Sequence, residues 1–164
     1  MLHSFVSLVH LLAVGVALAS GTRILLLPKG TPRHQRLGWA YVGSMALVLL
    51  TAFRMYYLFG RFGIVHWGAL GSSAALAVGT GAVLGRAVLP GWQRWHYLGM
   101  GASVTGLYAA LVVESTYRLF PATYFWWATL GPAAAVFALA ALVLRHHYPT
   151  ELPKSAEPPV GTRA

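Results

Sequence analysis

The sequence contains no cysteine and no aspartate, and charged residues make up only 9% of its 164 positions. The lack of cysteine excludes thiolate nucleophiles, iron–sulfur clusters and cysteine-based zinc sites. With three acidic residues in the chain, we do not expect sites built from paired or clustered carboxylates. A soluble domain typically has about 25% charged residues. This chain therefore has too few charges to cover a water-exposed surface.

The chain is instead rich in apolar residues. Hydrophobic residues account for 57% of it, and it contains 18 glycines and 6 tryptophans. Glycine and interfacial tryptophan are common in membrane helices. The net charge is +9, but the basic residues lie between apolar runs. We therefore expect anionic lipid headgroups, and not nucleic acid, as the partner of these charges.

Five apolar stretches approach the length of about 20 residues that a bilayer-spanning helix needs. They are nearly continuous and do not alternate with polar residues, which predicts helices and not barrel strands. The predicted spans are residues 4–27, 37–59, 64–84, 96–113 and 123–144. The sequence thus predicts an all-α, polytopic transmembrane helix bundle over residues 1–148. The polar, proline-containing residues 149–164 are predicted to be a disordered cytoplasmic tail.

Small residues predict how the spans pack. Spans three and four contain many glycines, among them Gly79 and Gly99, and small residues allow membrane helices to approach closely. We expect a four-helix core with a peripheral fifth helix, and the glycine-rich faces are candidate contacts with other membrane subunits. We also expect no helix-breaking proline inside the spans, which argues against a carrier built on broken helices.

The distribution of basic residues predicts the orientation. With five spans, one side of the membrane would hold Arg23, Lys29, Arg33, Arg36, Arg86, Arg94, Arg145, Lys154 and Arg163, and the other only Arg54, Arg61 and Arg118. The positive-inside rule places the richer side in the cytoplasm. The prediction is a multi-pass protein of the bacterial inner membrane with its N-terminus outside and its C-terminus in the cytoplasm.

Four histidines lie at or inside the predicted spans. His10 and His66 belong to the outer leaflet, and His34 and His96 to the inner one. Each pair lies on alternate helices, which are diagonal in an antiparallel four-helix core. Two neutral imidazoles that face one another are the ligands of a bis-histidine b-type haem. We therefore predict His10, His34, His66 and His96 as candidate cofactor-binding and metal-ligating residues, with one haem in each leaflet.

Neighbouring residues fit the inner haem. Gly38 and Gly99 lie about one turn after His34 and His96, where a missing side chain leaves room for a flat macrocycle. Several basic residues are available to pair with propionates: Lys29, Arg33, Arg36 and Arg94. The histidines also have a plainer interpretation as interfacial anchors. A copper site is another alternative, because His96 and Met100 share one helix face.

A second group of polar residues lies toward the outer side. Arg54 and Glu114 are near the outer ends of spans two and four, and a mutual ion pair would lower the cost of placing them there. Arg118, four residues after Glu114, is a competing partner. Together with His66, these groups are candidates for a proton or quinol site, or for a small-solute or proton carrier.

One stretch of the sequence resembles a known family. Residues Lys29-Gly30-Thr31-x-x-His34-x-x-x-Gly38-x-x-Tyr41-x-x-x-Met45, followed by His66 and by His96-x-x-x-Met100, resemble the domain-of-unknown-function 2306 family of prokaryotic membrane proteins. The likeness covers residues 10–113. It implies a small multi-span bacterial membrane protein with recurring histidines and no established activity. The diagonal histidine pairs are also similar, at the level of fold, to cytochrome b561-like bundles.

Besides the carrier mentioned above, two functions are compatible with this sequence. The leading hypothesis is a haem b protein that transfers electrons in or across the membrane. The alternative is a cofactor-free structural or assembly subunit of a larger respiratory or photosynthetic complex. The sequence contains no phosphate loop, nucleophile elbow or H-E-x-x-H motif, so catalytic residues are not assigned and enzymatic activity stays open.

Overall fold

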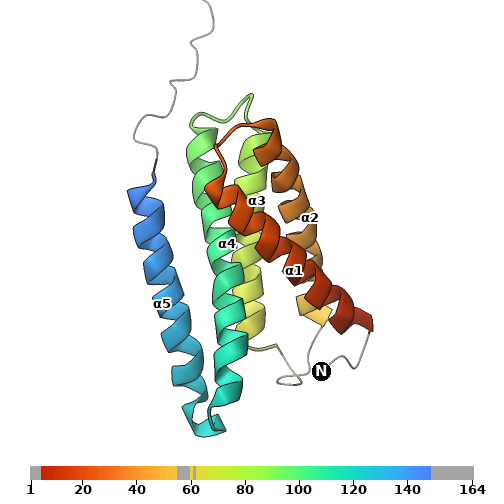
Figure 1. Ribbon diagram of the computed structural model, residues 1–164, viewed down its shortest axis with the longest axis vertical. Helices are drawn as coiled ribbons and strands as arrows, with labels where there is room; N and C mark the ends of the chain where they lie inside the picture. The colour runs from red at the N-terminus through yellow and green to blue at the C-terminus, as the bar shows by residue number, and fades with distance from the viewer. Residues whose placement is uncertain (1–4, 55–59, 61, 149–164) are drawn as a thin grey trace, which may run out of the picture.

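Figure 1 shows a computed structural model of the chain, which describes residues 5–54, 60 and 62–148. The five long helices are α1 (Phe5–Leu26), α2 (Pro32–Arg54), α3 (Ile64–Leu84), α4 (Trp92–Thr116) and α5 (Phe125–His146), with the short 3-10 helices η1 (Tyr117–Leu119) and η2 (Ala122–Tyr124). Each long helix is long and apolar enough to cross a membrane. The predicted all-α class is confirmed. The predicted tail, residues 149–164, lies outside the described residues.

Two helices begin before their predicted spans. The second begins at Pro32, not at residue 37, and the fourth begins at Trp92, not at residue 96. Hydropathy detects only the apolar part of a helix, whereas the first turns here are polar. Proline suits a first helical position because its missing N–H would have no partner there. Gly91, with φ of 66°, supplies the left-handed turn from which α4 starts.

Contacts among the first four helices close a ring in which consecutive helices are neighbours. We call this ring the square; α1 crosses the other helices obliquely (Figure 1). Close backbone contacts join α1 to α2, α2 to α3, α3 to α4, and α4 back to α1. This leaves α2 diagonal to α4. The diagonal is closed by a buried hydrogen bond of 2.8 Å between the hydroxyls of Tyr41 and Ser103. Helix α5 packs along α4, on the outside of this square, as predicted for a peripheral fifth helix.

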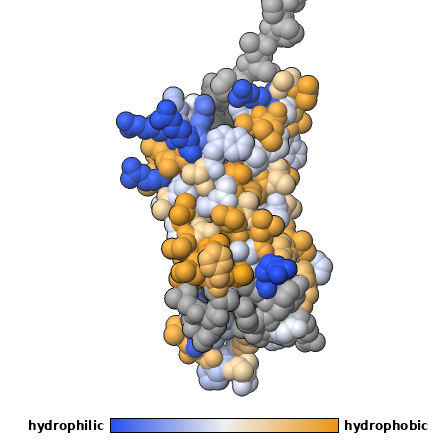
Figure 2. All heavy atoms as spheres, turned by 90° about the vertical axis from the view of Figure 1, so that its right-hand side faces the viewer, coloured by the Kyte–Doolittle hydropathy of each residue, from blue (hydrophilic) through white to orange (hydrophobic). Residues whose placement is uncertain are grey.

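The outer surface of the bundle is apolar over its middle. Figure 2 shows hydrophobic side chains across the centre of one face, with hydrophilic residues gathered mainly toward the end that carries the α1–α2 and α3–α4 connections. Trp127 is 80% exposed and Leu142 is 66% exposed. Large apolar side chains exposed on all the long helices are unfavourable in water but favourable in lipid. The chain is therefore an integral, multi-pass membrane protein.

Helices α3 and α4 approach most closely at two glycines. A Cβ added to Gly99 would lie 2.7 Å from the Cα of Gly79 and 2.8 Å from the carbonyl oxygen of Ala75. Both obstacles are backbone atoms, so only glycine fits there, and the expected close packing is confirmed at this point. By contrast, an added Cβ would meet no atom within 4 Å at Gly68, Gly71 or Gly81.

One expectation about the spans is wrong. Pro132 lies inside α5, and the helix continues through it. A proline removes the N–H that would bond the carbonyl four residues earlier, which here belongs to Ala128. The hydroxyl of Thr116 on α4 lies 2.9 Å from that carbonyl oxygen and donates to it. A donor from the neighbouring helix thus replaces the missing one, as in other proline-containing membrane helices.

Candidate functional site

The inner histidines meet across the α2–α4 diagonal. His34 lies in the first turn of α2 and His96 in the second turn of α4. Their ring centroids are 6.4 Å apart and the ring planes are nearly perpendicular, at 81°. These residues are 62 positions apart in the sequence, and the structure places them at the same end of the bundle. This is the juxtaposition that the sequence predicted for the inner pair.

The His96 ring is held by a backbone group of α3. Its Nδ1 lies 2.9 Å from the carbonyl oxygen of Gly79, so Nδ1 carries the proton and donates. In the neutral tautomer with this hydrogen bond, Nε2 is unprotonated. Histidines that bind metals are commonly oriented by this type of hydrogen bond. The close contact of Gly79 with Gly99 brings the Gly79 carbonyl within hydrogen-bond distance of His96. The packing of α3 on α4 thus orients the imidazole ring.

The motif around His34 is a helix start. Gly30 adopts φ of 79°, a left-handed conformation that favours glycine. Thr31 then accepts a hydrogen bond at 3.2 Å from the backbone N–H of His34, as an N-cap residue does. The Nδ1 atom of His34 is buried and has no hydrogen-bond partner within the described part of the chain. Burying a polar atom without a hydrogen-bond partner costs free energy, unless a bound group interacts with it.

The surroundings of this pair differ in part from the expectation. The space beside Gly38 is open, since an added Cβ would meet nothing within 4 Å. The expectation that Gly99 leaves room for a macrocycle is wrong, because α3 fills that space. Lys29 is also engaged: its Nζ donates to the carbonyls of Ile24 and Leu25 at 2.8 and 3.0 Å, and burial lowers its pKa. Of the arginines expected to pair with propionates, Arg33, Arg36 and Arg94 are exposed at this end.

The outer histidines have separate partners. His10 Nδ1 is 2.7 Å from the hydroxyl of Thr51 on α2. His66 caps its own helix: its Nδ1 accepts the backbone N–H of Gly63 at 3.1 Å, and its ring stacks on Phe62 at 4.8 Å. The Nδ1 atoms of both rings are thus used in helix packing and capping. The pairing of His10 with His66 stays a prediction.

Glu114, at the end of the bundle opposite His34 and His96, forms its ion pair with a residue close to it in the sequence. Glu114 accepts a hydrogen bond from Arg118 at 3.3 Å, and both side chains are 41% exposed. Of the two partners that the sequence offered, the one four residues away is the one seen. An exposed pair of this kind contributes little to stability. Arg54 ends α2 and is exposed.

A metal site with three or more ligands is not found in the described ranges, where no group of at least three acidic or histidine side chains converges. Met100, the copper alternative, packs over α3, and a Cβ added to Gly79 would lie 2.9 Å from its Sδ. The histidine pair found at close range in the described ranges of α2 and α4 is His34 and His96.

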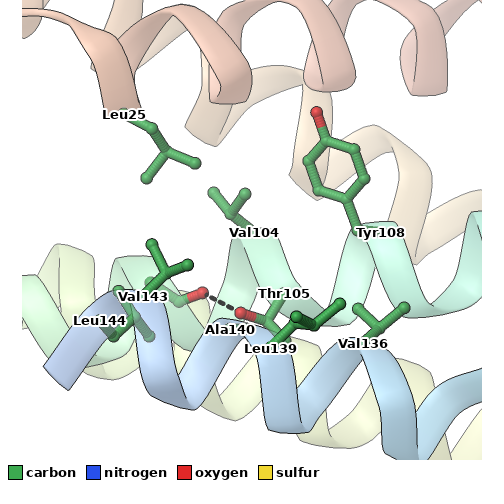
Figure 3. A pocket seen from close by; sticks show the side chains of 10 residues that line it. Leu25, Val104, Thr105, Tyr108, Val136, Leu139, Ala140, Val143 and Leu144 are labelled. Atoms are coloured by element: carbon green, nitrogen blue, oxygen red, sulfur yellow. Dashed lines mark hydrogen bonds between the residues drawn. The ribbon is translucent and has the colours of Figure 1, made fainter. Parts of the chain in front are cut away.

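The structure also contains a groove that sequence reasoning missed. It is lined by Leu25 of α1, by Gly101, Val104, Thr105 and Tyr108 of α4, and by Val136, Leu139, Ala140, Val143 and Leu144 of α5 (Figure 3). Its volume is about 190 Å³. Such apolar residues are indistinguishable in the sequence from those that face lipid, so no signal pointed to the groove.

Comparison with known proteins finds no matching family, no similar curated protein and no similar solved structure. The fold and the site therefore define a class only, which is a multi-pass membrane bundle with a diagonal pair of half-buried histidines at one end.

Proposed function

We propose that the protein binds one b-type haem through His34 and His96 and transfers electrons at the cytoplasmic side of the membrane. The observation that carries the proposal is the 6.4 Å separation of the two imidazole rings across the bundle. The cytoplasmic assignment rests on the excess of Lys and Arg at this end.

The separation matches two ligands of one metal atom. Two imidazoles that ligate one metal atom from opposite sides, through bonds of about 2 Å and with about 1 Å more from each nitrogen to its ring centre, would have ring centres about 6 Å apart. A haem held in this way would supply one-electron transfer. The protein would contribute the two ligands, an apolar surrounding and arginines for the propionates.

The protonation of the rings supports ligation. The Gly79 carbonyl keeps the proton of His96 on Nδ1 and leaves Nε2 available. His34 lies in the first turn of α2. Its buried Nδ1 also lacks a partner within the described residues, and a bound group would remove that cost.

The test is the absorption spectrum of the protein purified from cells supplied with iron and a haem precursor. We expect a Soret band that sharpens on reduction. In His34→Leu and His96→Leu the bound haem should be lost or become five-coordinate. His146→Leu removes an exposed histidine at the same end and should leave the spectrum unchanged.

Two results would overturn the proposal. A colourless protein from haem-replete cells would favour the cofactor-free subunit of a larger complex. Haem retained fully in both inner variants but lost in His10→Leu or His66→Leu would move the site to the outer histidines. Helical circular dichroism of every variant establishes that the loss is not caused by unfolding.

A further inference from the structure

We infer that the groove between α1, α4 and α5 is a binding site for the acyl chain of an anionic phospholipid, whose headgroup is held by Lys29 and Arg145. The proposal rests on the groove's shape, its lining and the charges at one of its ends. It is independent of haem binding.

The groove has the form that one hydrocarbon chain requires. Helix α4 makes its floor, and α1 and α5 make its two walls (Figure 3). Along α5 it extends from Val136 to Leu144, which is about 12 Å at 1.5 Å per residue. The hydroxyl of Thr105 donates to the carbonyl of Gly101 within its own helix, at 2.8 Å. The hydroxyl of this floor residue therefore already has a hydrogen-bond partner, and the rest of the lining offers mainly apolar contacts.

The end of the groove next to Leu25 and Leu144 is basic. Lys29 lies directly at this end, since its Nζ is 3.0 Å from the carbonyl oxygen of Leu25. Its ammonium has three N–H donors, of which the carbonyls of Ile24 and Leu25 use two. The third is left for an anion. Arg145 follows Leu144 in the last turn of α5 and is exposed.

Residues 5–54, 60 and 62–148 place no acidic side chain at this end. The carboxylate side chain of the described residues, Glu114, lies in the last turns of α4, at the other end of the bundle. The two cations therefore have no acidic side chain within the described ranges to neutralise them. A phosphate at the membrane interface, attached to a chain that fills the groove, supplies both the missing charge and the missing apolar contacts.

Native mass spectrometry tests this site. The full chain is extracted into detergent and equilibrated with equal amounts of phosphatidylglycerol and phosphatidylcholine that have identical acyl chains. We expect phosphatidylglycerol to be retained preferentially. Removing one basic contact should reduce that preference about fivefold. Lys29→Gln and Arg145→Gln each make this change. Arg86→Gln removes an exposed charge at the same end, after α3, and should preserve the preference.

A second pair of variants tests the groove itself. Ala140→Phe fills the groove and should lower retention of both lipids. Ala138→Phe adds the same ring to an exposed position on the opposite face of α5 and should have no effect. Equal retention of the two lipids in the parent protein would overturn the proposal. So would an Arg86→Gln effect as large as that of Lys29→Gln, or unchanged retention in Ala140→Phe with native helical content.

Discussion

Thr116 of α4 supplies the hydrogen-bond donor that Pro132 removes from the neighbouring helix α5. The proline of α5 removes the donor for the carbonyl of Ala128, and the Thr116 hydroxyl of α4 lies 2.9 Å from that oxygen. The same hydroxyl is 2.9 Å from the carbonyl of Val112 in its own helix. Its one proton therefore has alternative acceptors, and Pro132 makes the acceptor on α5 available. This contact attaches the peripheral helix to the core near the α4–α5 connection.

A double-mutant cycle measures the coupling of Thr116 and Pro132. Thr116→Val should lower the free energy of unfolding by about 1 kcal/mol, since a buried carbonyl loses its donor. In the Pro132→Ala background residue 132 regains an N–H, so the same change should cost much less. Unfolding by SDS in mixed micelles, followed by circular dichroism, gives both values. Equal costs in the two backgrounds would show that the contact carries no coupling.

The diagonal hydrogen bond between Tyr41 and Ser103 makes a second prediction. Both side chains are fully buried, at 0% exposure, and their hydroxyls are 2.8 Å apart. Tyr41→Phe should destabilise the bundle by about 1 kcal/mol, because the Ser103 hydroxyl loses its partner. The double variant Tyr41→Phe/Ser103→Ala should be less destabilised than the sum of the two single changes. Additive effects in the same SDS titration would contradict this coupling.

Two glycine substitutions separate packing from helix propensity. Gly99→Ala places a methyl group against backbone atoms of α3 and should destabilise the bundle by about 1–3 kcal/mol. Gly81→Ala adds the same methyl group where nothing lies within 4 Å, so it should be neutral or slightly stabilising. Thermal loss of helical structure in detergent compares the two variants. A neutral Gly99→Ala would mean that α3 and α4 move apart at little cost.

The sequence predicted the features that depend on composition and periodicity. The number of helices, the peripheral α5 and the inner histidine pair followed from apolar lengths and from the alternation of an antiparallel bundle. The square arrangement is what turns that alternation into the contact between His34 and His96. To predict this contact it was enough to place both histidines in the same leaflet. Helices two positions apart in such a four-helix ring are diagonal, so their side chains can meet at its centre.

Other features depend on contacts between particular side chains, which the pattern of apolar and polar residues in the sequence does not reveal. The partner of His10 is Thr51, and the side chain of Lys29 caps α1. Both bonds depend on rotation of a helix about its axis, which hydropathy does not determine. The role of Gly99 was misassigned for the same reason. A glycine on a helix permits a close approach, but the sequence does not say whether a cofactor, another helix or nothing makes it.

Cysteine labelling tests the predicted orientation of the helices. The chain has no cysteine, so one introduced thiol is the only reactive site. Ala87 and Ala122 are exposed residues in the connections at opposite ends of the bundle. If the basic end faces the cytoplasm, a membrane-impermeant maleimide should label Ala122→Cys from the periplasmic side. Ala87→Cys should react only after the inner membrane is permeabilised. The reverse pattern would place His34 and His96 on the outer side, and with them the proposed haem. A bundle that inserts in both orientations would label both thiols before permeabilisation. That result would contradict the topology while leaving the fold unaffected.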